Sequence, residues 1–363
     1  MLAGSQAIQM SNTADVPFAY ASARVRMLEQ RMLSRGDVER LLTAPSVHAG
    51  LRVLADTEYA SAMATMEETD DYELMLSAEL QRVYASVTSF APQSELLRMW
   101  VARYAFLALK MLLKAGFQQE TVDDRLLPLW TSVERAWLQE TARRAIEEEL
   151  ETDADDVTDS KELKAHLLRA ARAAVSAYRL YEAPEEIDHA VDALYQQYLM
   201  SLTDHPQSVF LRGWVVRFAD VTNLSTYVRF AVAGRSEDSL ARALLPGGII
   251  ASQHILKAYV EAEEPQERYE SLSQVLVGTA YAPLLAEGWQ AYQKEGLLYG
   301  MERLMDRFLQ RHLDLARFQP FGLGAVWAYL MAKEREVRLI RLILVGKSAG
   351  LSEEQLRERI DYV

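Results

Sequence analysis

The sequence predicts an all-α protein, and three observations support this fold class. Only 16 Gly and 10 Pro occur among the 363 residues, well below the roughly 12% of average composition, so turns should be few and elements long. Leu, Ala, Arg, Glu, Met and Gln, which lose little side-chain entropy in a helix, fill the sequence. No segment shows the strict alternation of apolar and polar residues that is typical of a half-buried strand.

Apolar residues recur at helical spacing, and two segments show this clearly. Residues 96–117 are predicted to form a mostly buried helix, because a narrow stripe of Arg and Lys interrupts an apolar background. An apolar line from Val326 to Leu344 predicts a second long helix. A C-cap is expected at Gly346, since glycine often follows the last helical turn. Prolines are expected to end or separate helices at positions 92, 184, 246, 265 and 320.

The charge and cysteine content exclude several classes of function. A net charge of −13 argues against binding to nucleic acid or to anionic lipid, because both need a basic surface. The uncharged stretch at residues 321–332 is shorter than the about 20 residues that a membrane-spanning helix requires. Residues 1–16 lack the basic and apolar regions of a signal peptide, and the chain has no cysteine for disulfides or thiolate chemistry. We therefore expect a cytoplasmic protein without a transmembrane segment.

Internal repeats are the most informative feature of the sequence. A Leu followed four residues later by an aromatic residue occurs three times, at Leu80 and Tyr84, Leu194 and Tyr198, and Leu304 and Phe308. A second echo pairs Thr57-x-Tyr59-Ala60 with Thr279-x-Tyr281-Ala282. These spacings predict three related helical units, each far longer than the roughly 34–47 residues of helical solenoid repeats. The predicted units span residues 17–130, 131–250 and 251–363, after a disordered extension at residues 1–16.

An acidic stretch lies near one of these predicted boundaries. Glu147 to Asp159 holds eight acids in 13 residues, so we expect a solvated loop or a frayed helix end. Within it, Asp155-Asp156-Val157-Thr158-Asp159 matches the DDxxD metal-diphosphate motif of all-α terpenoid synthases. The second acidic cluster that those enzymes need is not found. A terpenoid-type enzyme that uses this motif is the weaker alternative function.

Other catalytic motifs are incomplete. Gly346-Lys347-Ser348 resembles the end of a phosphate-binding loop, yet Arg341 stands where the motif requires its first glycine. Glu186-x-x-His189 has the spacing of a di-iron ligand pair, but such sites need a second copy and further Glu residues. We therefore predict no catalytic, cofactor-binding or metal-binding residues and no cofactor, and the chain is not expected to be an enzyme.

Three groups of motifs carry a resemblance to a known family. The start contains Phe18–Glu29, Arg31–Asp37 and Leu54–Tyr59; the middle contains Asp220-x-x-Asn223-Leu224, Val228-Arg229 and Leu244-Leu245-Pro246-Gly247-Gly248; the end contains Tyr329–Arg341, Gly346-Lys347 and Gly350-Leu351. With these motifs the sequence resembles the C subunits of the V/A-type ATP synthases, which are related to the d subunit of the eukaryotic V-ATPase. Ala105 and Ala108 depart from the pattern, since the family often shows Asp and Asn there, and Glu336-Val337 only loosely replaces Asn-Leu.

The resemblance implies a non-catalytic socket in a rotary ATPase. Three pseudo-threefold-related helical domains would form a funnel on the cytoplasmic face of the membrane proteolipid ring. The central-stalk shaft subunits would dock into it, so that rotation reaches the ring and ATP turnover is linked to proton or sodium transport. The protein would be peripheral to the membrane through this complex. A generic all-helical adaptor or scaffold is the alternative function.

Seven residues are candidates for a partner interface. They are polar or charged and fall in the family motifs of the middle and the end of the chain: Asp220, Asn223, Arg229, Lys333, Glu334, Arg338 and Arg341. Each has an alternative interpretation as an internal contact that pins one helix to its neighbour, because buried polar groups need partners inside the protein.

Overall fold

The computed structural model describes residues 18–68, 71–92, 95–123, 127, 133–147, 159–205, 208–318 and 322–360. These residues form helices joined by short turns and contain no strand, so the all-α prediction is confirmed. The elements are α1 (Ala19–Glu29), α2 (Arg35–Thr43), α3 (Val47–Leu54), η2 (Glu58–Thr65), α4 (Tyr72–Phe90), α5 (Glu95–Gln118), α6 (Arg135–Ile146), α7 (Asp159–Tyr181), α8 (Pro184–Leu202), α9 (Val209–Ala233), α10 (Glu237–Ala243), α11 (Ser252–Val260), α12 (Pro265–Val275), α13 (Ala282–Glu295), α14 (Tyr299–Asp314), η5 (Leu315–Phe318), α15 (Leu323–Ser348) and α16 (Glu353–Arg359).

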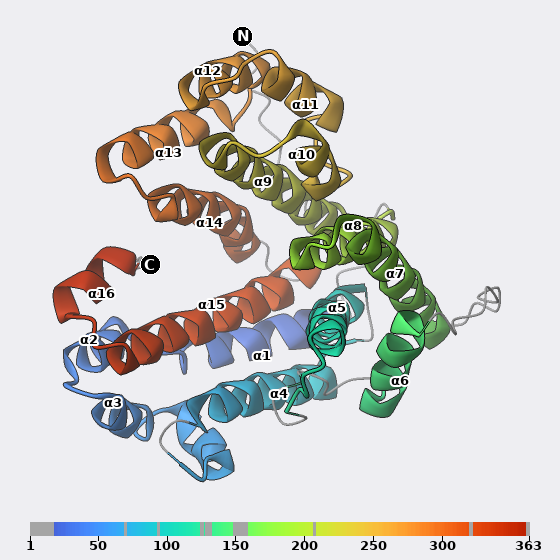
Figure 1. Cartoon of the computed structure of the whole chain (residues 1–363). Coiled ribbons are helices and arrows are strands. Elements are labelled where there is room, and N and C mark those ends of the chain that lie inside the picture. The colour runs from blue at the N-terminus through green and yellow to red at the C-terminus, as the bar shows by residue number, and fades with distance from the viewer. Residues whose placement is uncertain are drawn as a thin grey trace. The chain divides into compact units, whose positions relative to one another are not determined.

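The chain forms two compact units. Unit 1 combines residues 1–94 with residues 313–363. Its longest helix, α15, packs against α1, α3 and α4, and Figure 1 shows α15 running alongside α1. The short helices α2 and α16 pack on each other, and each begins with a capping box, formed by Ser34 and Asp37 in α2 and by Ser352 and Gln355 in α16. Unit 1 is therefore built from segments on either side of unit 2 in the sequence.

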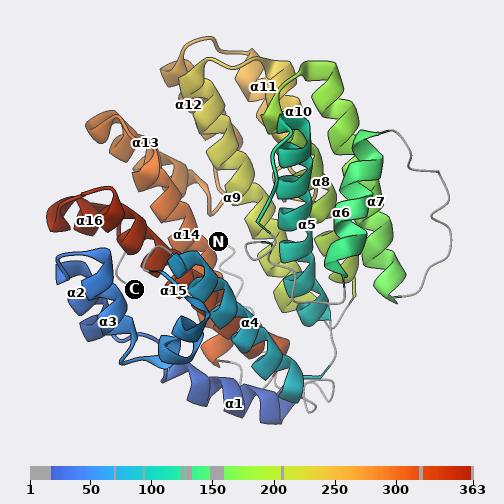
Figure 2. The ribbon, with the colours of Figure 1, turned by 60° about the horizontal axis from the view of Figure 1, so that its bottom comes forward.

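Unit 2 spans residues 95–312 and contains α5 to α13 and all but the last two residues of α14. Helices α5, α6, α7 and α8 lie side by side, as Figure 2 shows, and α9 packs against α8 and α10 to α12. Proline stands in the first turn of α8, α12 and α13, where its missing N–H is not needed. A left-handed glycine, Gly234, ends α9.

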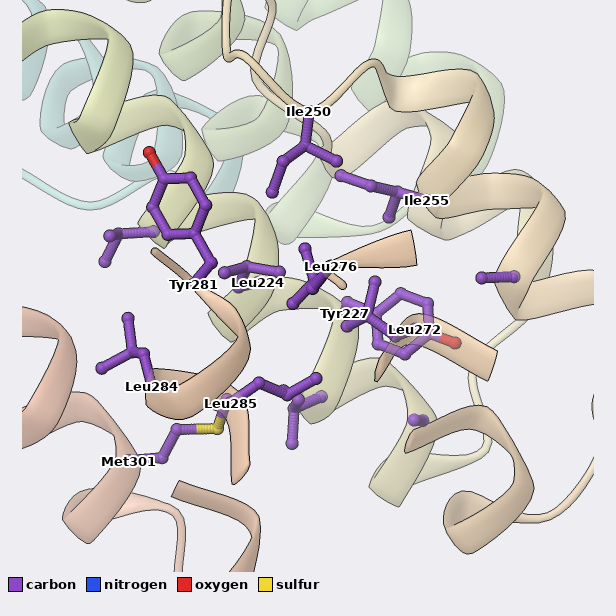
Figure 3. Close-up of a cluster of buried hydrophobic side chains, with 14 of the residues drawn as sticks. Leu224, Tyr227, Ile250, Ile255, Leu272, Leu276, Tyr281, Leu284, Leu285 and Met301 are labelled. Atoms are coloured by element: carbon purple, nitrogen blue, oxygen red, sulfur yellow. The ribbon is translucent and has the colours of Figure 1, made fainter. Parts of the chain in front are cut away.

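A cluster of buried apolar side chains holds the second half of unit 2 together. Figure 3 shows Leu224 and Tyr227 of α9 facing Ile255 of α11, Leu272 of α12 and Leu285 of α13. Removal of apolar surface from water contributes about 25 cal/mol of favourable free energy per Å², and this is the main stabilisation of such a cluster. It fixes α9 relative to the loops that precede α11 and α13, where the buried candidates Asp220 and Asn223 make their contacts.

The sequence echoes fall on a recurring pair of helices. Each Leu-x-x-x-aromatic motif lies on a helix of 16 to 19 residues, α4, α8 or α14, that is followed by one of 24 to 26 residues, α5, α9 or α15. The division into three units at 17–130, 131–250 and 251–363, and their arrangement as a pseudo-threefold funnel, stay predictions.

The C-cap at Gly346 is wrong: α15 continues to Ser348, and the left-handed glycine after it is Gly350. Gly346 instead allows α16 to approach, since a Cβ there would lie 2.4 Å from Cδ2 of Leu356.

The expectations for residues 1–16 and for the acidic stretch, apart from its two ends, concern positions outside the described residues. Among the helices that the structure describes, none has the length and hydropathy to cross a lipid bilayer.

Candidate functional site

Asp220 lies on α9 in the interior of unit 2 and is fully buried. Its carboxylate accepts hydrogen bonds from the backbone N–H groups of Ile249 and Ile250, both at 3.1 Å, and from the hydroxyl of Tyr281 at 2.7 Å. A Cβ at Gly248 would lie 2.2 Å from Oδ1 of Asp220, so only glycine lets this loop approach the carboxylate. Burial and the hydrogen bond to Asp220 raise the pKa of Tyr281 far above its usual range, so its hydroxyl is a donor at neutral pH.

Asn223 lies one turn further along α9 and is also fully buried. Its side-chain nitrogen donates to the carbonyl of Leu245 at 2.9 Å, and its side-chain oxygen accepts from the N–H of Leu245 at 2.7 Å. Asp220 and Asn223 thus hold the loop between α10 and α11 against α9. Their known contacts are internal, as the alternative interpretation requires, and a contact with a partner stays a prediction.

Lys333 lies at the centre of a buried charged cluster in unit 1, which we call the Lys333 cluster (Lys333, Glu79, Glu336, Tyr59 and Leu33). The ammonium group of Lys333 lies 2.8 Å from Oε1 of Glu79 on α4 and 2.7 Å from Oε1 of Glu336 on α15. Glu336 also accepts from the hydroxyl of Tyr59 at 2.8 Å and from the N–H of Leu33 at 2.6 Å. Each of the three charged side chains is at most 5% exposed.

Arg82 and the ring of Tyr59 add to the electrostatics of this cluster. Arg82 makes two hydrogen bonds to Glu79, at 2.7 and 2.9 Å, and also lies 3.4 Å from a carboxylate oxygen of Glu58. The ammonium group of Lys333 also lies 4.6 Å from the ring centroid of Tyr59. Burial, together with the negative charge of Glu336, raises the pKa of Tyr59 well above its usual range. The cluster joins α15 to α4, to η2 and to the loop before α2.

The contacts of Tyr59 and Tyr281 explain the second sequence echo. In both places a Thr two residues earlier donates its hydroxyl to a backbone carbonyl at 2.7 Å and accepts the N–H of the Tyr, at 3.3 Å for Tyr59 and 3.2 Å for Tyr281. In both places the Tyr hydroxyl then donates to a buried carboxylate on a long helix, Glu336 or Asp220. Glu336 therefore occupies in unit 1 the role that Asp220 has in unit 2.

The remaining candidates are more accessible, with one exception. Arg229 pairs with Glu302 on α14 at 2.5 Å, and Arg341 pairs with Glu73 on α4 at 2.8 Å. All four of these side chains are substantially exposed, between 37% and 54%. Arg338 is exposed, whereas Glu334 is buried. Arg229, Arg338 and Arg341 are thus the candidates that can reach a partner without rearrangement of the fold.

Sequence reasoning missed two participants of these clusters. Glu79 was not a candidate, although it lies on the buried face of α4 with Leu76 and Val83 at helical spacing. Glu336 was noted only as a loose match to the family motif. For Glu79 the available signal was a carboxylate among apolar residues at helical spacing, and for Glu336 it was Lys333 three residues earlier on the same helix, because a buried charge needs a charged partner.

The incomplete catalytic motifs are explained by internal contacts. Glu186 accepts two hydrogen bonds from Arg242, both at 2.9 Å, and lies 3.5 Å from Nδ1 of His189. The ammonium group of Lys347 donates to the carbonyls of Leu42, at 2.7 Å, and Ala44, which close the end of α2. Within the described ranges, no group of three or more His, Asp or Glu side chains is arranged to hold a metal ion. The residues between Asp155 and Thr158 lie outside those ranges.

Comparison with known proteins identifies the family. The model of the ATP synthase (C/AC39) subunit family matches residues 21–359. The C subunit of the A-type ATP synthase of Methanocaldococcus jannaschii is 27% identical, over 94% of this chain and 85% of the relative. The C subunit of the V-type sodium ATPase of Enterococcus hirae is 26% identical, over 93% of this chain and 96% of the relative. The C subunit of the A-type ATP synthase of Pyrococcus abyssi is 22% identical, over 95% and 90%.

These matches extend over all three groups of motifs and over both units of the structure, which confirms the resemblance drawn from the sequence. The chain belongs to the ATP synthase (C/AC39) subunit family.

Proposed function

We propose that the chain is the socket that couples the rotor shaft of a V/A-type rotary ATPase to the proteolipid ring of its membrane sector. The observation that carries this proposal is the family match over residues 21–359, together with relatives that are named as C subunits of A-type and V-type ATPases. As a member of the C/AC39 family the chain is an accessory subunit rather than a catalytic one. It lies on the cytoplasmic side and reaches the membrane only through the complex.

Torque transmission needs a body that does not deform, and the structure supports this requirement. Close-packed interiors have low compressibility and transmit strain. In unit 1 the Lys333 cluster joins α15 to α4 through charges that are almost completely buried. In unit 2, Asp220 and Asn223 fix the loop before α11 to α9. The buried candidates thus serve the function by stiffening the socket, and the exposed Arg229, Arg338 and Arg341 are left as candidates for contact with the shaft or ring.

The coupling role has a direct test. Membranes that lack this protein should still hydrolyse ATP, because the catalytic sites lie on other subunits, but ion pumping should stop because the mechanical path is missing. The measurement is the ratio of ions transported to ATP hydrolysed, with protons and sodium tested separately. A normal ratio in membranes without the protein would rule out the socket role.

The partner interface has a separate test. Arg338→Glu and Arg341→Glu should weaken retention in the complex if these side chains face a partner, while the melting temperature of the isolated chain changes little. Arg52→Glu is the control, because Arg52 is an exposed side chain of α3 in the same unit. A large loss of thermal stability with unchanged retention would assign the two arginines to internal contacts. A generic scaffold, the alternative function, would join proteins other than those of the shaft and ring.

A further inference from the structure

The outward face of α1 has an unusual composition for this acidic chain. Tyr20 and Met27 are 62% and 61% exposed, and Arg24 and Arg31 are exposed between and beyond them. The four side chains follow one another at intervals of four, three and four residues, which places them on one stripe of the helix and of the turn that continues it. We call them the α1 stripe. No Asp or Glu lies on it.

The opposite face of α1 is already used by the fold. Ala21, Ser22 and Val25 are buried, and α1 packs against α15 and α4. The α1 stripe is therefore not the side that the helix needs to join unit 1. Single exposed apolar residues are ordinary on a protein surface, but Tyr, Met and Arg are the residue types that are enriched at protein interfaces, where Asp and Glu are depleted.

Part of the stripe is held in place before any partner binds. The guanidinium of Arg24 lies 5.0 Å from the ring centroid of Phe90 and donates to the hydroxyl of Tyr20 at 3.1 Å. The ring of Tyr20 meets that of Phe90 edge to face, with centroids 6.4 Å apart. Tyr20 and Arg24 would then lose less side-chain entropy when a partner binds. The guanidinium of Arg31 makes a long ion pair, 3.7 Å, with Glu58.

We propose that the α1 stripe is a docking surface for an acidic helix of a partner protein in the assembly. Arg24 and Arg31 are seven residues apart, or about 10 Å along the axis. A partner helix with two carboxylates seven residues apart and an apolar residue between them matches both cations and the thioether of Met27. Opposite charges at such a contact guide the partner and set its register. This inference rests on the proposed function, because it requires that the chain acts inside an assembly.

A lipid surface is a poorer match than an acidic helix. Helices that lie on membranes separate a basic face from a broad apolar face, which they bury in the lipid. In α1 the apolar face is buried in unit 1, and the α1 stripe alternates apolar and basic residues. The net charge of −13 also opposes approach to anionic lipid.

The absence of cysteine makes a sharp experiment possible, because an introduced thiol is unique within this chain, whose labelling is read on its own band after the subunits are separated. Met27→Cys is labelled with a maleimide in the isolated chain, in the presence of vesicles that contain phosphatidylserine, and in the assembled ATPase. Arg52→Cys, in the same unit, is the matched control. We expect fast labelling of Met27→Cys in the isolated chain and with vesicles, and labelling slowed by about tenfold or more only in the assembly, as for the core of an interface. A photo-crosslinker on this thiol should capture a partner peptide that contains acidic residues.

Charge reversal gives an independent measurement. Arg24→Glu combined with Arg31→Glu should lower retention in the ATPase by about tenfold or more, with stronger loss at low salt, whereas Arg52→Glu should not. The proposal is overturned if Met27→Cys is labelled equally fast in the assembly, if it is already protected in the isolated chain, or if vesicles alone protect it. A crosslink to a segment without acidic residues would overturn it as well. If the chain without substitutions enters the complex but Met27→Cys is labelled as fast there as in isolation, the α1 stripe is not the docking surface, and the socket role stands. If the unmodified chain never enters the complex, the proposed function itself fails.

Discussion

Replacing Lys333 by methionine tests whether the buried charges of unit 1 act as one cluster. The side chain of Lys333 is 3% exposed, and its two carboxylate partners are 0% and 5% exposed. Methionine keeps most of the apolar stem, so the change removes the charge with little loss of packing. Glu79 keeps Arg82 and Glu336 keeps Tyr59 and an N–H donor, but the positive charge between them is lost. Breaking a buried ion pair in this way costs about 3–5 kcal/mol.

The assay is thermal and urea unfolding of the isolated chain, followed by circular dichroism. For a cooperative unit of roughly 150–250 residues, 1 kcal/mol corresponds to about 2–4 °C, so Lys333→Met should lower the melting temperature by roughly 6–20 °C. Arg341→Met is the matched control: its ion pair with Glu73 is exposed, and such pairs contribute about 0–1 kcal/mol. Adding Glu336→Gln to Lys333→Met should restore part of the lost stability, because Glu336 is the carboxylate that Lys333 compensated, whereas Glu79 keeps Arg82. If Lys333→Met loses no more stability than Arg341→Met, the cluster does not hold unit 1 together.

Three further changes test local features. Gly248→Ala should lower the free energy of unfolding by about 1–3 kcal/mol through overpacking against Asp220. Gly36→Ala, the control, should not lower it, because a Cβ there would meet no atom closer than 3.6 Å. Equal effects of the two changes would contradict the glycine argument. Gln119 has a φ of 57°, and Gln119→Gly should raise the stability by about 0.5 kcal/mol, because relief of left-handed strain exceeds the extra chain entropy of glycine; a loss in urea unfolding would refute this. Burial lowers the pKa of His312 from its usual value of 6.5. The unfolded chain therefore protonates His312 at a higher pH than the folded chain, and stability falls as the pH drops below 6.5. His312→Phe should flatten the acid side of a stability–pH curve, and an unchanged curve would exclude this contribution.

Much of the fold could be predicted from the sequence, because helix formation is locally encoded. The predicted helix at residues 96–117 is α5 with an error of one residue at each end, since its apolar background and narrow charged stripe leave few other solutions. The C-cap at Gly346 failed for a tertiary reason. The helix continues through Gly346 because the glycine is needed for the close contact with α16, which local sequence does not reveal.

The contacts of the candidate residues could not be predicted from the sequence. The motifs identified Asp220, Asn223 and Lys333 as unusual polar positions. Their long-range hydrogen-bond partners are about 22 to 254 positions away in the chain. The burial of Glu79 could not be predicted either, because in the sequence a single Glu on a helix looks the same whether it faces solvent or a buried cation. Whether Arg229, Arg338 and Arg341 meet a partner depends on molecules that one chain does not contain.

The construction of unit 1 from two distant segments has a consequence for synthesis on the ribosome. Glu79 emerges long before Lys333, and the roughly 250 residues between them take on the order of 10–50 s to translate. During this interval the apolar face of α4 has no α15 to pack against, and Glu79 lacks the ammonium group of Lys333, while the residues of unit 2 are being synthesised. The first quarter of the chain should therefore be a substrate for chaperones and proteases until α15 arrives. Ribosome-bound chains that stop before residue 323 should be degraded much faster from their N-terminal region than chains that include residue 348.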